Sequence, residues 1–121
     1  MANSRQKGAD FEREVVNELK EKGLDAKKVP LSGAVSDFEG DIWISPSKDS
    51  KYWQNFPVPK LVVEAKRRKR GFKTIYDAIE QGGGNDIVVA RDDRKEAFFV
   101  LPKKTMYYFL EEAGWLQKKE G

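Results

Sequence analysis

The sequence predicts an α/β domain whose elements follow one another in the order α-β-β-β-α-β-β-α. Apolar residues recur at helical spacing near both ends of the chain, and short apolar or alternating segments lie between them. The 121 residues suit one domain with a modest core, and no stretch has the composition of a linker. We therefore expect residues 1–121 to form a single domain.

The first element is a helix predicted over residues 5–22, with Gly23 as its C-terminal stop. Its apolar positions at helical spacing are Phe11, Val15, Val16 and Leu19. At about 100° per residue, Glu12 falls inside this apolar stripe and Glu14 points away from it. Glu12 is therefore the carboxylate expected to face the core. The alternative is a side chain at the edge of the stripe that extends into water.

Three strands are predicted next, over residues 24–29, 41–45 and 61–66. Side chains alternate along a strand, so Asp41 and Trp43 lie on the face opposite Ile42. The same rule places Glu64 and Lys66 on one face of the third strand, about 7 Å apart. If the last two strands are neighbours, Asp41 and Glu64 can converge on one ion. We expect these two carboxylates, together with Glu12 and Lys66, to be set among buried apolar residues.

The remaining elements are a helix over 74–81, strands over 87–90 and 96–101, and a final helix from Pro102 to near Gly114. Between the second and third strands, residues 46–59 form a long polar insertion. Its aromatic residues are Tyr52, Trp53 and Phe56. They suit stacking on bases, or packing within their own loop.

The composition restricts the available chemistry. The chain contains no cysteine and no histidine, which excludes thiolate nucleophiles, histidine general bases and the common zinc sites. The oxygen ligands that remain favour Mg²⁺, Mn²⁺ or Ca²⁺. Of these we expect Mg²⁺ as the cofactor, with Mn²⁺ as a substitute. No apolar run approaches the ~20 residues of a membrane span, so we expect an intracellular protein that makes no membrane contact.

Cations are concentrated in one run, residues 66–70, within a chain of net charge +3. A local positive patch indicates a polyanionic partner, and the alternative is an ordinary solvated loop. An acidic residue on a helix, Gly-Asp at a strand start and Glu-x-Lys about twenty residues later form an ordered set. Together with the cations, this set suits metal-assisted cleavage of a phosphodiester.

The segments that carry the set resemble the PD-(D/E)xK nuclease superfamily, and more closely the Holliday junction resolvases of archaea and their phage relatives. The matching segments are RQKGADFERE, the SGA loop, GDIWI and LVVEAK. The resemblance implies a restriction-endonuclease-like core, with a central mixed five-stranded sheet flanked by helices. It also implies a Mg²⁺-dependent enzyme of DNA recombination and repair that cuts four-way junctions by paired symmetric nicks, acts as a homodimer, and resides in the host cytoplasm if phage-encoded.

The resemblance also implies roles for individual residues. The catalytic residues would be Glu12, Asp41, Glu64, Lys66 and Ser32, with Ser36 as the alternative serine. The metal ligands would be Glu12, Asp41, Glu64 and the backbone carbonyl of Ala65. The DNA contacts would be Arg5, Lys7, Arg13, Arg67, Arg68, Lys69 and Arg70. Two alternatives stay open: another repair or restriction-type nuclease of this superfamily, and a non-catalytic nucleic-acid-binding module whose carboxylates form structural ion pairs.

Overall fold

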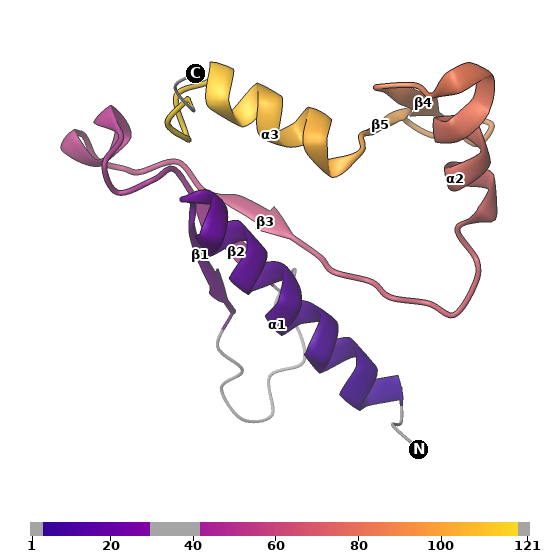
Figure 1. Cartoon of the computed structure of the whole chain (residues 1–121), viewed down its shortest axis with the longest axis horizontal. Helices are drawn as coiled ribbons and strands as arrows, with labels where there is room; N and C mark the ends of the chain where they lie inside the picture. Colours follow the sequence, from indigo (N-terminus) through magenta and orange to yellow (C-terminus); the bar gives the residue numbers. More distant parts are fainter. Residues whose placement is uncertain (1–3, 30–41, 119–121) are drawn as a thin grey trace. The chain divides into compact units, whose positions relative to one another are not determined.

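A computed structural model of the chain describes residues 4–29 and 42–118, with the side chains from residue 7 onward. The described residues form three α-helices and two small antiparallel sheets in the order α-β-β-β-α-β-β-α, with two short 3₁₀ turns, η1 (Lys51–Gln54) and η2 (Gln81–Gly83) (Figure 1). The order of elements agrees with the sequence prediction. The single five-stranded mixed sheet does not, because the strands pair in sets of three and two, all antiparallel.

The chain divides into two compact units, and each is described by itself. The first unit comprises residues 1–67 and 111–121, and the second comprises residues 68–110. The first unit contains α1 (Ser4–Lys22), β1 (Asp25–Lys28), β2 (Ile42–Ser45) and β3 (Leu61–Val63). The expectation of a single domain stays a prediction.

Helix α1 ends where the sequence predicts, through a Schellman motif at Gly23. The amide of Gly23 donates to the carbonyl of Lys20 at 2.9 Å, and the amide of Leu24 donates to the carbonyl of Leu19 at 3.1 Å. Gly23 has a φ of 109°, a conformation that a residue with a Cβ rarely adopts. The buried side chains of Leu19 and Leu24 add the apolar contact typical of this motif. The turn directs the chain from α1 into β1.

The three-stranded sheet has the order β1-β2-β3, with β2 in the centre. Ile42 is paired with Lys28 on one side and Val63 on the other. Burial alternates along β2: Ile42 and Ile44 are buried, whereas Trp43 is half-buried on the opposite face. This alternation confirms the sequence prediction for β2.

The core of the first unit lies between α1 and one face of this sheet. Its most buried members are Leu19, Leu24, Ala26, Val29, Ile42 and Ile44, each less than 5% exposed. Burying an isoleucine or leucine side chain fully contributes about 1.5–3 kcal/mol. These contacts hold α1 against the strands. They therefore also position the side chains that α1 and the strands carry at the end of the sheet.

Strand β3 is shorter than predicted, because it ends at Val63 rather than Lys66. Residues 64–70 form neither helix nor strand. This segment carries six charged side chains among its seven residues. Glutamate and lysine are depleted in strands, and the strand ends where the apolar residues end.

The second unit contains α2 (Lys73–Glu80), β4 (Val88–Ala90), β5 (Phe98–Val100) and most of α3 (Lys103–Glu112). Strands β4 and β5 form a hairpin in which Val89 is opposite Phe99. The amide of Lys95 donates to the carbonyl of Asp92 at 3.1 Å, which closes the turn between them. The predicted hairpin is thus present, but it forms a separate two-stranded sheet.

The insertion after β2 is attached to the body of the first unit. The hydroxyl of Tyr52 donates to the carbonyl of Ala113 at 2.6 Å, and its ring packs edge-on against Trp115. The indole of Trp53 donates to the carbonyl of Pro46 at 2.8 Å. Trp53 therefore packs within its own loop, which is the second of the two alternatives from the sequence, whereas Tyr52 packs outside the loop, against residues that follow α3. Phe56 remains 84% exposed.

Candidate nuclease site

The candidate site lies at one end of the three-stranded sheet. Adjacent strands are antiparallel, so β1 ends, β2 begins and β3 ends at this same end of the sheet. The residues in that row are Lys28, Ile42 and Val63. Glu64 directly follows the last residue of β3. The condition set by the sequence analysis, that β2 and β3 be neighbours, is met.

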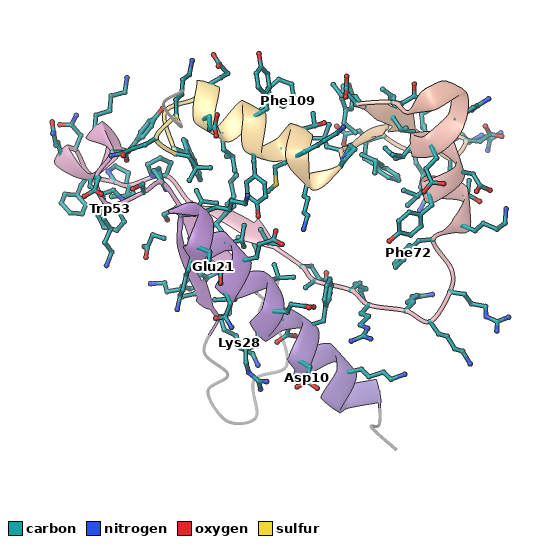
Figure 2. The ribbon with its side chains drawn as sticks, in the orientation of Figure 1. Asp10, Glu21, Lys28, Trp53, Phe72 and Phe109 are labelled. Carbon is teal, nitrogen blue, oxygen red and sulfur yellow. The ribbon has the colours of Figure 1, made fainter. Side chains whose placement is uncertain are left out.

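Glu12 reaches this end of the sheet from α1. Its carboxylate Oε2 lies 3.1 Å from the Nζ atom of Lys28, and its side chain is 19% exposed. Figure 2 labels Lys28 at the end of β1. Glu14 is exposed, so the helical phase identified the carboxylate that faces the sheet. Lys28 supplies a cation beside this partly buried carboxylate.

Lys28 was not among the residues identified from the sequence. It is the last residue of β1 and is paired with Ile42 in the register. No motif marks it, because its position depends on how β1 pairs with β2, a contact between residues distant in sequence. Its place at the end of the strand before the acidic motif was the only available signal.

Glu64 and Lys66 lie together, with 3.7 Å between the Oε1 atom of Glu64 and the Nζ atom of Lys66. The expectation that they are buried is wrong, because their side chains are 58% and 62% exposed. Both follow the end of β3, where the sheet no longer covers them. At this exposure the pair contributes little to stability, and its two charges are accessible to a ligand. Ala65, between them, is half-buried.

Three of the predicted catalytic positions cannot be placed. Asp41, Ser32 and the alternative Ser36 lie outside the described residues, as does the side chain of Arg5. Within the described part of the chain, no cluster of three acidic residues is close enough to hold a metal ion. Glu12 and Glu64 are each joined to a lysine, and they supply the oxygen donors that suit a hard cation.

The predicted DNA-contacting cations are exposed wherever they are described. Lys7, Arg13 and the run from Arg67 to Arg70 all have exposed side chains. Arg13 forms an ion pair with Asp10 at 3.2 Å, one helical turn away. An exposed pair of this kind stabilises the protein by only a few tenths of a kcal/mol. A DNA phosphate can therefore replace Asp10 as the partner of Arg13. The cations are therefore available for binding.

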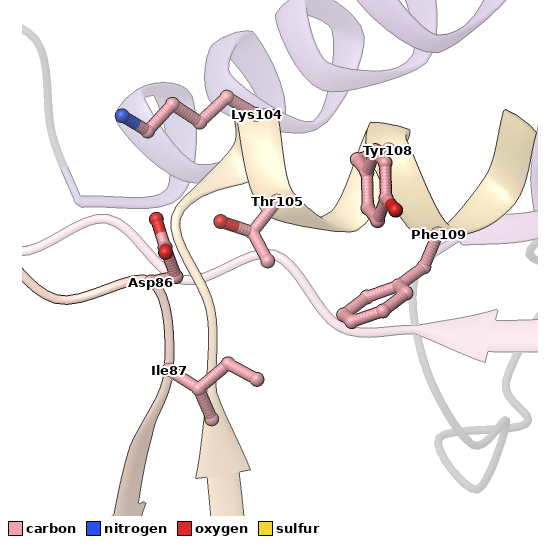
Figure 3. A pocket seen from close by; sticks show the side chains of 6 residues that line it. All are labelled: Asp86, Ile87, Lys104, Thr105, Tyr108 and Phe109. Carbon is pink, nitrogen blue, oxygen red and sulfur yellow. The ribbon is translucent and has the colours of Figure 1, made fainter. Parts of the chain in front are cut away.

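A hollow of about 400 Å³ lies in the second unit (Figure 3). Its lining consists of Asp86, Ile87, Lys104, Thr105, Tyr108 and Phe109. The apolar part of this lining is largely open to solvent, since Tyr108 is 56% and Phe109 47% exposed. The catalytic candidates that the structure describes, Glu12, Glu64 and Lys66, do not line this hollow.

The model of a family described as archaeal Holliday junction resolvase (Hjc) matches residues 3–107. Neither the curated proteins nor the solved structures gave a significant match. Among the described helices, none is long and apolar enough to cross a membrane. The family match spans most of the chain and includes every segment of the candidate site, so the protein belongs to the archaeal Holliday junction resolvase family, whose members are structure-selective nucleases that act on branched DNA.

Proposed function

We propose that this family member is a Mg²⁺-dependent endonuclease that resolves four-way DNA junctions by paired symmetric nicks. The observation that supports this most directly is the antiparallel pairing of β2 with β3. Asp41 immediately precedes β2 in the sequence and Glu64 immediately follows β3, so the pairing favours a common location for the two carboxylates. Glu12 approaches the same end of the sheet from α1.

The proposed metal site consists of Glu12, Asp41, Glu64 and the backbone carbonyl of Ala65. These are hard oxygen donors, the type that Mg²⁺ and Mn²⁺ prefer. A divalent metal held there would activate water, neutralise charge on the phosphate and stabilise the leaving oxygen. Lys28 already neutralises Glu12, so binding of a metal by Glu12 requires this ion pair to open.

Lys66 supplies a fixed positive charge beside the proposed metal site. Its ammonium lies 3.7 Å from Glu64 and is well exposed, which leaves it free to contact the scissile phosphate and the attacking water. Ser32 is proposed as a further catalytic residue, on the strength of the family resemblance. The cations Lys7 and Arg13, and the run from Arg67 to Arg70 that directly follows Lys66 in the sequence, would position the DNA backbone without selecting its sequence.

We further propose that the protein acts as a homodimer. A four-way junction has approximate two-fold symmetry and must be cut on two strands, which a C2 dimer with two equivalent sites matches. The second unit carries large exposed apolar side chains that a partner surface would cover. Among the described residues these include Phe98, Phe99, Tyr108 and Phe109, each 47–67% exposed.

One substitution tests the proposed chemistry. The Asp41→Asn protein should lose junction cutting in Mg²⁺ and keep wild-type junction affinity, because the substitution removes a metal-binding charge and no DNA contact. Cutting would be followed on labelled four-way junctions, and binding in EDTA. Retention of wild-type cutting by Asp41→Asn would contradict the proposed site.

The second candidate is a non-catalytic DNA-binding module. A specific observation favours it: both described site carboxylates are paired with lysines, as structural ion pairs would be. Titration with Mn²⁺ separates the two functions. The nuclease should bind Mn²⁺, and the variants Asp41→Asn and Glu64→Gln should each weaken that binding. A protein that binds junctions but shows no Mn²⁺ affinity would be the binding module.

A further inference from the structure

Two lysines and one tryptophan form a cluster on the outer face of the three-stranded sheet, the face away from α1. Trp43 lies opposite Lys27 of β1 and Val62 of β3 in the register. The Nζ atoms of Lys27 and Lys60 lie 5.7 and 3.9 Å from the centroid of a Trp43 ring. We call Lys27, Trp43 and Lys60 the tryptophan cluster. It contains none of the residues assigned so far to the nuclease site.

The charges of this cluster are unbalanced. Both lysines are exposed, and among the described residues neither forms an ion pair with a carboxylate. Asp25 lies on the same face, two residues from Lys27, and it too forms no ion pair with either lysine. Since both ammonium groups lie within cation–π range of one indole, they are at most roughly 10 Å apart. Two like charges held this close are a suitable site for an anion with repeated charges.

Trp43 organises these ammonium groups. Contact with an indole face holds a lysine by about 0.5–1 kcal/mol at an exposed site, and the aliphatic part of the side chain covers the ring. The charge itself stays in water and available. Lysines restrained in this way lose less conformational freedom when they bind a ligand than lysines that move freely.

The position of the cluster points to the ligand. Trp43 is opposite Val62, which is two residues before Glu64, and Lys60 is about 13 Å from Glu64 along an extended chain. We infer that the tryptophan cluster binds the sugar–phosphate backbone of the junction arm next to the scissile phosphate, an inference that rests on the proposed nuclease function. One DNA strand carries a phosphate every ~3.4 Å of helix axis, so the two lysines can each contact a phosphate of the same strand.

The test is the salt dependence of junction binding by the double variant Lys27→Ala/Lys60→Ala. Binding of a labelled four-way junction would be measured by fluorescence anisotropy in EDTA, between 50 and 200 mM NaCl. Because log K falls with log salt, loss of two phosphate contacts should make this negative slope shallower by about 2, and should weaken binding on the order of ten-fold at low salt. The variant Lys27→Arg/Lys60→Arg keeps both charges and should retain the wild-type slope.

A matched control removes the same net charge elsewhere. Lys20 and Lys22 are exposed in the last turn of α1, and the variant Lys20→Ala/Lys22→Ala should keep the wild-type slope. Equal losses in the two alanine variants would mean that only total charge matters, and would overturn the inference. So would a wild-type slope in Lys27→Ala/Lys60→Ala. If either result is found while the wild-type protein cuts four-way junctions, the inference fails and the proposed function stands. A wild-type protein that neither binds nor cuts junctions refutes the proposed function as well.

Discussion

Replacement of Glu12 by glutamine should separate catalysis from stability. The substitution removes the charge that lies 3.1 Å from the Nζ atom of Lys28 and leaves the side chain nearly unchanged in size. Lys28 is half exposed, so its ammonium can regain water when its partner is lost. We therefore expect the free energy of unfolding to fall by only about 0.5–1 kcal/mol. This is the upper part of the range for exposed ion pairs, because Glu12 is partly buried.

The effect on cutting should be much larger. Loss of a metal-binding carboxylate should lower the rate of junction cutting at least ~100-fold, equivalent to about 2.7 kcal/mol in the activation barrier. A domain with the usual 5–15 kcal/mol of stability stays folded after a loss of 1 kcal/mol, so unfolding cannot account for that decrease. The assays are single-turnover cutting of a four-way junction and urea denaturation.

Glu14 provides the matched control, since it lies on the same helix two residues away and is exposed. The Glu14→Gln protein should cut and unfold like the wild type. If Glu12→Gln and Glu14→Gln cut equally well, Glu12 has no role in catalysis and the helical-phase argument for its function is refuted. If Glu12→Gln lowers stability and cutting in proportion, Glu12 is a structural residue only.

Three further predictions concern the stability of the fold. Ile42→Ala should destabilise the protein by about 2–5 kcal/mol because Ile42 is fully buried, whereas Val62→Ala, at a position 51% exposed, should cost less than about 1 kcal/mol; equal costs in thermal melts would contradict the assigned core. Tyr52→Phe should cost about 1 kcal/mol in urea denaturation through loss of the hydroxyl bond to Ala113, and an unchanged midpoint would show that the insertion is not anchored there. Asp77→Asn should change stability by less than about 0.5 kcal/mol, because its ion pair with Lys73 is highly exposed, and a larger loss would refute that assessment.

Local features of the fold were predictable from the sequence. The stop at Gly23 depends on the conformation that glycine permits, and the burial of Ile42 depends on strand alternation. The choice of Glu12 over Glu14 depends on helical phase alone. Each of these features depends on residues close together in the chain. The conformation of one glycine, or the repeat of a helix or a strand, was therefore sufficient to predict it.

Features that depend on distant residues were not predictable in the same way. The extension of β3 to Lys66 assumed that pairing continues through charged residues, and instead it stops at Val63. The pairing of Glu12 with Lys28 requires knowledge of how α1 and β1 pack. The five-stranded sheet assumed that β4 and β5 join the other strands, whereas among the described strands they pair with each other and not with β1, β2 or β3.

The most direct test of the central claim is the cleavage pattern on matched DNA substrates. Four-way, flap and linear duplex DNAs of equal length would be incubated with the wild-type protein, with and without Mg²⁺, and the cut positions mapped on every strand. We predict paired nicks, symmetric about the branch point, on the four-way junction only and only with Mg²⁺. Equal cutting of the linear duplex, or cutting that persists without a divalent metal, would contradict a metal-dependent junction resolvase.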